Sequence, residues 1–192
     1  YSSGTTGLPK GAVLTHHTLS SRTAIGLVES GRFASDISFH TAPFFHVAGS
    51  QLDYSVLVKG GTVLRHRQFD AERAAHALQD LGVTSAFFVP SMINAVLQVP
   101  EISSLDFSKL RLIEYGAAPM PQAQLRAAID VFGCSFVQLF GAGTEGGMQA
   151  ILPAEDHIVG GTDVQTRRLS SIGRPTAFTE VRVINEDGIP VS

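Results

Sequence analysis

Apolar and polar positions along the chain follow two repeats, one typical of amphipathic helices and one typical of buried strands. Residues 71–81 place Ala74, Ala77, Leu78 and Leu81 on one helical face, and Asp70 stands where a helix cap is expected. Residues 83–89 form an apolar run, which predicts a strand buried on both faces. The same reasoning predicts helices over residues 16–28 (capped by Thr15), 71–81 and 121–132, a helix beginning at Pro90, and strands over residues 37–42, 61–64, 83–89, 112–115 and 135–140.

Strands and helices that alternate at this spacing predict an α/β fold, with a mostly parallel sheet flanked by helices. After Glu145 the pattern changes, because glycines separate short apolar segments that end in residues 180–184 and a turn at 186–188. This part predicts a smaller antiparallel β segment at the C-terminal end. We therefore expect residues 1–145 to form an α/β core and residues 146–192 a β-rich segment of the same domain.

Composition narrows the class of protein. The chain has 192 residues, which suits one domain of roughly 100–200 residues. Its net charge of −3 disfavours a nucleic-acid surface, which usually carries a basic excess. Hydrophobic residues make up 44% of the chain and charged residues 16%, which excludes a disordered role and is a low charge for a free-standing domain. The single cysteine, Cys134, fits a reducing compartment, and we expect a cytoplasmic protein.

The longest uncharged segment, residues 81–100, raises the question of a membrane span. Pro90, Asn94, Gln98 and Pro100 place too many polar groups and helix breakers in it, so we predict a buried strand followed by a buried helix. The first residues show neither a basic region nor an apolar region of a signal peptide. We expect no membrane span.

A glycine-rich segment stands at the start of the sequence, where residues 1–11 read YSSGTTGLPKG. Gly4 and Gly7 allow backbone N–H groups to converge on phosphate oxygens, the hydroxyl side chains add donors, and Lys10 supplies a mobile positive charge. The composition alone is equally typical of a flexible surface loop. A P-loop of the Walker A type is excluded, because Gly11 rather than Ser or Thr follows Lys10.

This segment resembles the phosphate-binding signature of the adenylate-forming (AMP-binding) superfamily, which includes acyl-CoA synthetases, aryl-CoA ligases, luciferases and peptide-synthetase adenylation domains. Further segments resemble the family in its own order along the chain, and most resemble acyl-CoA synthetases. They are residues 43–46 (PFFH), 115–121 (YGAAPMP), 138–145 (QLFGAGTE), and 171–175 (SIGRP) followed by 180–188. The resemblance implies a portion of the large N-terminal domain of an adenylate-forming enzyme.

The resemblance also implies a reaction and its residues. Such enzymes use ATP to convert a carboxylic acid to an acyl-adenylate, and then transfer the acyl group to a thiol such as that of coenzyme A. Lys10 would bind the outer phosphates, Thr144 the α-phosphate and Glu145 a Mg²⁺ ion, while His46 would lie near the carboxylate. The nucleotide would contact Ser2, Ser3, Gly4, Thr5, Thr6, Gly7, Lys10, Gly116, Ala117, Ala118, Pro119, Gln138, Phe140, Gly141 and Thr144. The acyl pocket would be lined by His46, Phe88, Val89, Pro90 and Met92, whose apolar character favours a fatty or aromatic acid.

Simpler interpretations stand beside these roles. The small residues after position 115 also suit tight packing, and Phe140 and His46 also suit a core. Arg65, His66 and Arg67 form a basic cluster that suits either a solvated surface or the phosphates of coenzyme A. The family has one residue between the Gly and the Thr of its motif, whereas this chain has Ala142 and Gly143, an insertion that a bulge at Gly143 would absorb.

Three functions stay open at this point. The chain is part of an acyl- or aryl-CoA ligase, an adenylation module that loads a carrier protein, or a nucleotide-binding piece without turnover of its own. The family's ribose-binding aspartate, hinge and small C-terminal domain with its catalytic lysine have no counterpart in the 192 residues. We therefore expect little ligase activity from this chain alone, and self-association through apolar faces that missing segments would cover.

Overall fold

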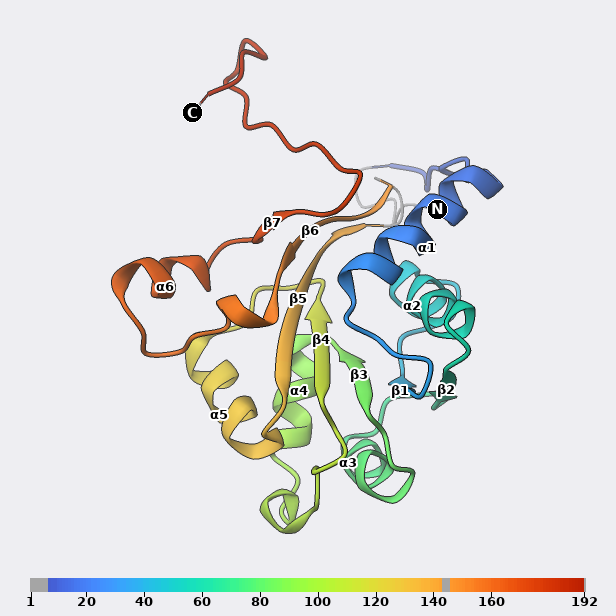
Figure 1. Cartoon of the computed structure of the whole chain (residues 1–192), viewed down its shortest axis with the longest axis vertical. Helices are drawn as coiled ribbons and strands as arrows, with labels where there is room; N and C mark the ends of the chain where they lie inside the picture. The colour runs from blue at the N-terminus through green and yellow to red at the C-terminus, as the bar shows by residue number, and fades with distance from the viewer. Residues whose placement is uncertain (1–6, 143–145, 192) are drawn as a thin grey trace.

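The computed structural model describes residues 7–142 and 146–191. Its strands form one seven-stranded sheet in the order β2-β1-β3-β4-β5-β6-β7 (Figure 1). Strands β1 to β5 run parallel, and β6 and β7 continue the sheet antiparallel, which confirms the predicted α/β fold. The strands span Ile37–His40 (β1), Thr62–Arg65 (β2), Ser85–Phe88 (β3), Leu112–Gly116 (β4), Ser135–Ala142 (β5), Gly147–Leu152 (β6) and Arg174–Pro175 (β7).

The helices begin where the sequence places their caps. Thr15 accepts a hydrogen bond from the backbone N–H of Thr18 at 3.1 Å, and Asp70 accepts one from Arg73 at 2.9 Å. Pro90 is the first residue of its helix, as predicted. The helices span His16–Glu29 (α1), Val47–Val58 (α2), Ala71–Asp80 (α3), Pro90–Leu97 (α4), Gln122–Phe132 (α5) and Asp163–Arg168 (α6), with short 3₁₀ turns at Ile102–Ser104 and Ala154–Asp156.

Three features differ from the sequence prediction. Helix α2 was not predicted, because it buries the polar residues Asp53, against the sheet, and Ser55, against Gly26 of α1, and so lacks an apolar stripe. Helix α6 is short and lies in the region predicted to be β structure. The predicted strand at residues 180–184 is reduced to one antiparallel bridge between Ile184 and Pro190, with backbone hydrogen bonds from Val191 to Val183 and from Asn185 to Ile189 across the predicted turn. Figure 1 shows the chain after β7 extending away from the sheet.

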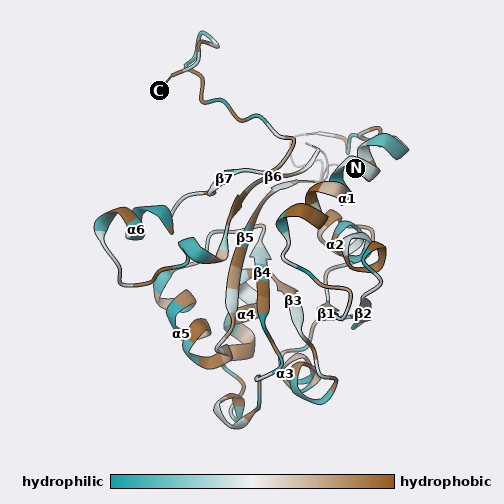
Figure 2. Ribbon diagram, viewed as in Figure 1, coloured by the Kyte–Doolittle hydropathy of each residue, from teal (hydrophilic) through white to brown (hydrophobic). Residues whose placement is uncertain are grey.

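The two faces of the sheet differ in chemistry because successive side chains of a strand point to opposite faces. Phe39, Ala86, Phe88 and Ile113 belong to the main hydrophobic core with α3, α4 and α5. Figure 2 shows hydrophobic residues gathered on the central strands β4 and β5. The alternate positions carry polar residues that face α1 and α2, and they are Ser38, His40, Ser85 and Glu114.

Buried ion pairs join this polar layer to the helices above it. Glu114 pairs with Arg32, which follows α1, and both side chains are 1% exposed. His40 Nδ1 lies 2.6 Å from Asp53 Oδ1 of α2, and His40 Nε2 lies 3.0 Å from Ser38 Oγ. Charges at such depth require partners, so these contacts fix how α1 and α2 sit on the sheet.

The burial of two histidines, His40 and His157, leads us to expect that the folded protein loses stability in mild acid. Burial lowers the pKa of His40, against the opposing effect of Asp53, and burial likewise lowers the pKa of His157. In the unfolded chain these histidines take up a proton near pH 6.5, whereas in the folded chain they take it up only at a lower pH. Stability that is present above pH 6.5 is therefore lost as the pH falls below that value. We expect a loss of about 1 kcal/mol per histidine between pH 7 and 5.5.

Thermal denaturation at the two pH values measures this loss in the full-length protein. The variant His157→Gln should lose markedly less stability on acidification, whereas exposed His17→Gln should behave as the wild type. Equal acid sensitivity of the His157→Gln variant and the wild type would contradict the assignment.

The outer surface leaves several large apolar side chains exposed, among them Leu8, Val13, Phe45 and Phe178. Self-association through such faces stays a prediction. Within the part of the chain that the structure describes, no helix is both long enough and apolar enough to cross a bilayer.

Candidate functional site

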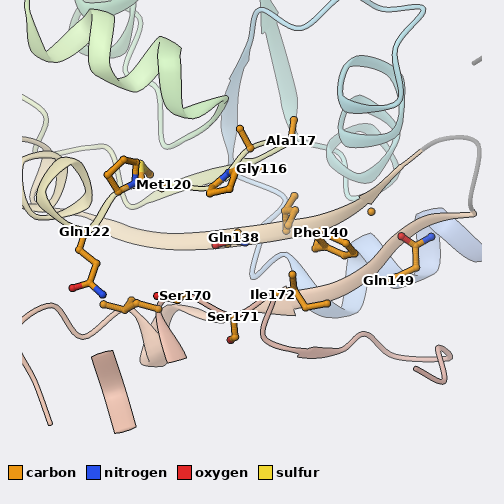
Figure 3. Close-up of a pocket in the computed structure, with 16 residues that line it drawn as sticks. Gly116, Ala117, Met120, Gln122, Gln138, Phe140, Gln149, Ser170, Ser171 and Ile172 are labelled. Carbon is orange, nitrogen blue, oxygen red and sulfur yellow. The ribbon is translucent and has the colours of Figure 1, made fainter. Parts of the chain in front are cut away.

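A cavity of about 600 Å³ opens at the carboxyl ends of the central strands β4 and β5. This edge is where ligands bind in open α/β sheets. Three segments that are distant in sequence surround the cavity, namely the turn after β4, the second half of β5, and the segment after α6 (Figure 3). Its lining residues are 116–122, 138–141, Gln149 and 169–172.

The turn after β4 brings backbone unusually close to the neighbouring strand. A Cβ atom at Gly116 would lie 2.4 Å from the backbone oxygen of Leu139, so only glycine fits there. Ala117 has a φ of +69°, in the left-handed region that residues with a side chain rarely adopt. The strain is stored where the chain borders the cavity, and the small side chains leave the backbone accessible to a flat ring. The structure thus brings the predicted residues Gly116, Ala117, Ala118 and Pro119 to one wall of the cavity.

Gln138 is held on the β5 side of the cavity by a buried hydrogen-bond network. The Tyr115 hydroxyl lies 3.2 Å from Gln138 Oε1 and 3.0 Å from His157 Nε2. His157 Nδ1 lies 2.8 Å from the Pro153 carbonyl oxygen, which can only accept, so Nδ1 carries the ring proton and Nε2 is an acceptor. The single Tyr115 hydroxyl proton is therefore shared between two acceptors, Gln138 Oε1 and His157 Nε2. Burial raises the pKa of Tyr115, which keeps the hydroxyl protonated. Tyr115 and His157 therefore orient a residue that the sequence predicted at the nucleotide site.

Phe140 stands between this cavity and a second, smaller one. Its side chain is 46% exposed, and it lines both cavities. The pairing of β5 with β6 shifts at this point, because Phe140 lies opposite Ala150 and Gly141 lies opposite Met148. The predicted bulge at Gly143 lies outside the described residues. At this shift in the pairing of β5 and β6, Gln149 lines the larger cavity, and Figure 3 shows its side chain near Phe140.

The smaller cavity, of about 90 Å³, lies between the sheet and the helices α1 and α2. His46 is one of its lining residues and caps α2: its Nδ1 accepts a hydrogen bond from the backbone N–H of Ala48 at 3.2 Å. A ring that accepts at Nδ1 carries its proton on Nε2. The two cavities share Gly116, Ala117, Phe140 and Gly141 in their walls, so a molecule in one would adjoin a molecule in the other.

Arg22 of α1 is a lining residue of the smaller cavity that sequence analysis missed. Its Nε donates to the carbonyl of Gly146 at 2.8 Å, and its aliphatic stem packs on Gly147, where a Cβ would lie 3.0 Å away. Burial lowers the pKa of the guanidinium, which stays charged at neutral pH. No signal in the sequence distinguishes this arginine from a surface residue of an amphipathic helix.

Four residues predicted for the acyl pocket lie elsewhere. Phe88 is fully buried in the main core, because alternation along β3 points it toward α3–α5 and points Phe87 toward the smaller cavity. Pro90 and Met92 belong to α4 on that same side, and Val89 caps this helix. Of the predicted acyl-pocket residues, only His46 is brought to the smaller cavity within the described ranges.

Several predicted phosphate and metal residues lie outside the described residues. They are Ser2, Ser3, Gly4, Thr5, Thr6, Thr144 and Glu145. Gly7 and Lys10 are described, and both are exposed ahead of α1. Their roles stay predictions.

Comparison with known proteins places the chain in a family. A family described as "AMP-binding enzyme" matches residues 1–192. The chain belongs to this family. It is 34% identical over 192 residues to a fatty acid–[acyl-carrier-protein] ligase, ScoC, from Streptomyces coeruleorubidus, covering 98% of this chain and 36% of the relative. It is 35% identical to a feruloyl-CoA synthase from an Amycolatopsis species, covering 100% and 37%. The chain thus spans little more than a third of these curated relatives.

Solved structures of this AMP-binding family share the fold. The N-terminal domain of FACL13 from Mycobacterium tuberculosis, in an inhibitor-bound crystal structure, is 31% identical with a TM-score of 0.89, covering 100% of this chain and 46% of that one. ATP-bound MatB from Rhodopseudomonas palustris is 25% identical with a TM-score of 0.85, covering 100% and 36%. The sheet and its flanking helices therefore form part of an N-terminal domain of the FACL13 type.

Proposed function

We propose that the chain forms the nucleotide- and acid-binding part of an ATP-dependent acid–thiol ligase. The observation that carries the proposal is the contact between the two cavities. The larger cavity, with its exposed turn at residues 117–119, suits a nucleotide, and the smaller one, beside His46, suits a carboxylic acid. Their common wall at Gly116, Ala117, Phe140 and Gly141 would bring an α-phosphate beside a carboxylate.

The proposed reaction has two steps. One carboxylate oxygen attacks the α-phosphorus of ATP, and the bond to pyrophosphate breaks, which gives an acyl-adenylate. A thiol sulfur then attacks the acyl carbon and AMP leaves, so that a thioester forms and the thiol proton is released. Both steps bring anions together, and donors around the phosphates would lower the barrier by stabilising the charge that develops.

In this scheme we assign roles to Lys10, Gln138 and His46. Lys10 would neutralise charge on the outer phosphates, and Gln138, oriented by Tyr115, would face the base. His46 would face the carboxylate with a ring proton on Nε2, since its Nδ1 is engaged by Ala48. Mg²⁺, as a hard cation, would be held by carboxylate oxygen, and its predicted ligand Glu145 lies outside the described residues.

The substrate we propose is a fatty or aromatic acid, with coenzyme A as the acceptor. The apolar lining of the smaller cavity, which includes Phe87, Leu139 and Met148, supports an apolar acid. The relative named feruloyl-CoA synthase supports an aromatic acid and a coenzyme A acceptor. The relative ScoC, named as a ligase to acyl carrier protein, favours a second candidate, in which a carrier protein replaces coenzyme A.

An ATP–pyrophosphate exchange assay on the full-length protein tests the proposal. We expect exchange of labelled pyrophosphate into ATP that depends on an added fatty or aromatic acid, and thioester formation when coenzyme A is present. Exchange with thioester formation only on a carrier protein would favour the second candidate. Binding of ATP without exchange for any acid in a broad panel would contradict both and indicate a nucleotide-binding protein without turnover.

A further inference from the structure

Arg65, at the end of β2, is half-buried, and its guanidinium contacts the loop after β1 and helix α2. Its Nη1 donates to Asp53 Oδ2 at 2.6 Å and lies 3.3 Å from the Gly49 carbonyl oxygen, and its Nη2 donates to the Ala42 carbonyl. The guanidinium also lies over the ring of Phe44, 5.5 Å from its centroid. One side chain therefore joins both ends of residues 42–49, a segment made of the loop after β1 and the first turn of α2.

That segment determines where His46 lies. The backbone N–H of His46 donates to the Pro43 carbonyl at 2.9 Å, and the first turn of α2 packs directly on the same carbonyl. A Cβ at Gly49 would lie 2.1 Å from Pro43 O, so the segment and the helix fit only at close range. Because His46 lies in the middle of this segment and caps α2, a shift of the loop against the first turn of α2 moves its ring.

The contact of Arg65 with Asp53 anchors this arrangement to the sheet. Asp53 is 3% exposed, and its other carboxylate oxygen accepts a hydrogen bond from His40, whose ring is fully buried. Burial keeps the pKa of His40 low, so this ring donates without neutralising the carboxylate. Arg65 is the fully charged partner of Asp53, and its fork geometry lets it bind the carboxylate and two backbone carbonyls at once.

We propose that Arg65 is a positioning residue, which holds the segment of residues 42–49 so that His46 lies at the cavity beside the carboxylate to be activated. The part that concerns catalysis rests on the proposed function. This assignment replaces the sequence-based hypothesis that the basic cluster binds the phosphates of coenzyme A, since the guanidinium of Arg65 is engaged within the fold. Arg67, two residues later, is exposed and provides a matched control.

The first experiment needs no catalytic activity. Hydrogen–deuterium exchange of the full-length protein is followed by mass spectrometry for peptides that cover residues 42–50, in the wild type and in Arg65→Met and Arg67→Met. We expect about tenfold faster exchange in Arg65→Met and wild-type exchange in Arg67→Met. Unchanged exchange in Arg65→Met overturns the proposal whatever the enzyme does. If Arg65→Met does not fold, Arg65→Lys serves in its place, because an ammonium keeps the charge beside Asp53 but cannot reach all three acceptors together.

The second experiment measures pyrophosphate exchange with the preferred acid. We expect Arg65→Met to raise the KM for the acid about tenfold and to leave the KM for ATP within about twofold, with Arg65→Lys between it and the wild type. Thioester formation, measured on the same variants, supplies the KM for coenzyme A: a raised value in both Arg65→Met and Arg67→Met, with the KM for the acid unchanged, overturns the proposal in favour of a coenzyme A site. If the wild type shows no acid-dependent exchange, the proposed function fails, and the deuterium-exchange experiment alone decides whether Arg65 positions the segment.

Discussion

Replacing Lys10 with alanine in the full-length protein is expected to lower acid-dependent pyrophosphate exchange by about 100- to 1,000-fold. The leaving pyrophosphate carries most of the charge that develops, and a mobile ammonium close to it stabilises the transition state more than the ground state. Lys10 is exposed ahead of α1, within the glycine-rich segment.

Lys109→Ala is the matched control for this variant. Lys109 is also exposed, but it precedes β4 at the amino end of the strands, whereas the cavity opens at their carboxyl ends. We expect wild-type exchange from Lys109→Ala and unchanged thermal stability in both variants. A Lys10→Ala variant that keeps exchange within about threefold of the wild type would show that another group neutralises the outer phosphates.

The sequence predicted those helices and strands whose caps or apolar runs lie within the element or directly beside it. The caps at Thr15 and Asp70 lie beside the helices they start, and the apolar runs of β3, β4 and β5 are typical of parallel strands. Helix α2 gave no such signal. It packs its polar residue Asp53 on His40 of β1, so the hydrophobic repeat that marks a helix on an apolar core is absent.

The candidate site was predicted only in part, because some of its residues carry a local signal in the sequence and others do not. The turn at residues 116–119 follows its strand directly, and the structure brings it to the larger cavity. Phe88, predicted for the acyl pocket, lies in the main core and Phe87 lines the smaller cavity, because a run that is apolar on both faces does not indicate which face each residue takes. The contacts of Arg22 and Arg65 within the fold were not predicted, since their partners Gly146 and Asp53 become neighbours only in the folded chain.

The buried pair of Arg32 and Glu114 predicts the largest change in stability from one substitution. Glu114→Gln keeps the shape of the side chain but removes its charge, and leaves the guanidinium of Arg32 without an opposite charge in a place that is 1% exposed. Arg32 would keep its hydrogen bond from Nη1 to the Leu52 carbonyl, at 2.9 Å. Breaking one side of such a pair costs about 3–5 kcal/mol, so we expect the Tm to fall by roughly 10 °C.

A double variant separates the charge from the packing. Arg32→Met combined with Glu114→Leu removes both charges and refills the space with apolar atoms, and such replacements are often neutral or stabilising. We therefore expect the double variant to melt well above Glu114→Gln, while Glu180→Gln, which breaks an exposed pair with Arg182, should leave the Tm unchanged. If the double variant were the least stable, the pair itself would supply net stability. A recovery instead means that the uncompensated charge causes the loss, and that Arg32 and Glu114 specify how α1 sits on the sheet rather than strengthen the fold.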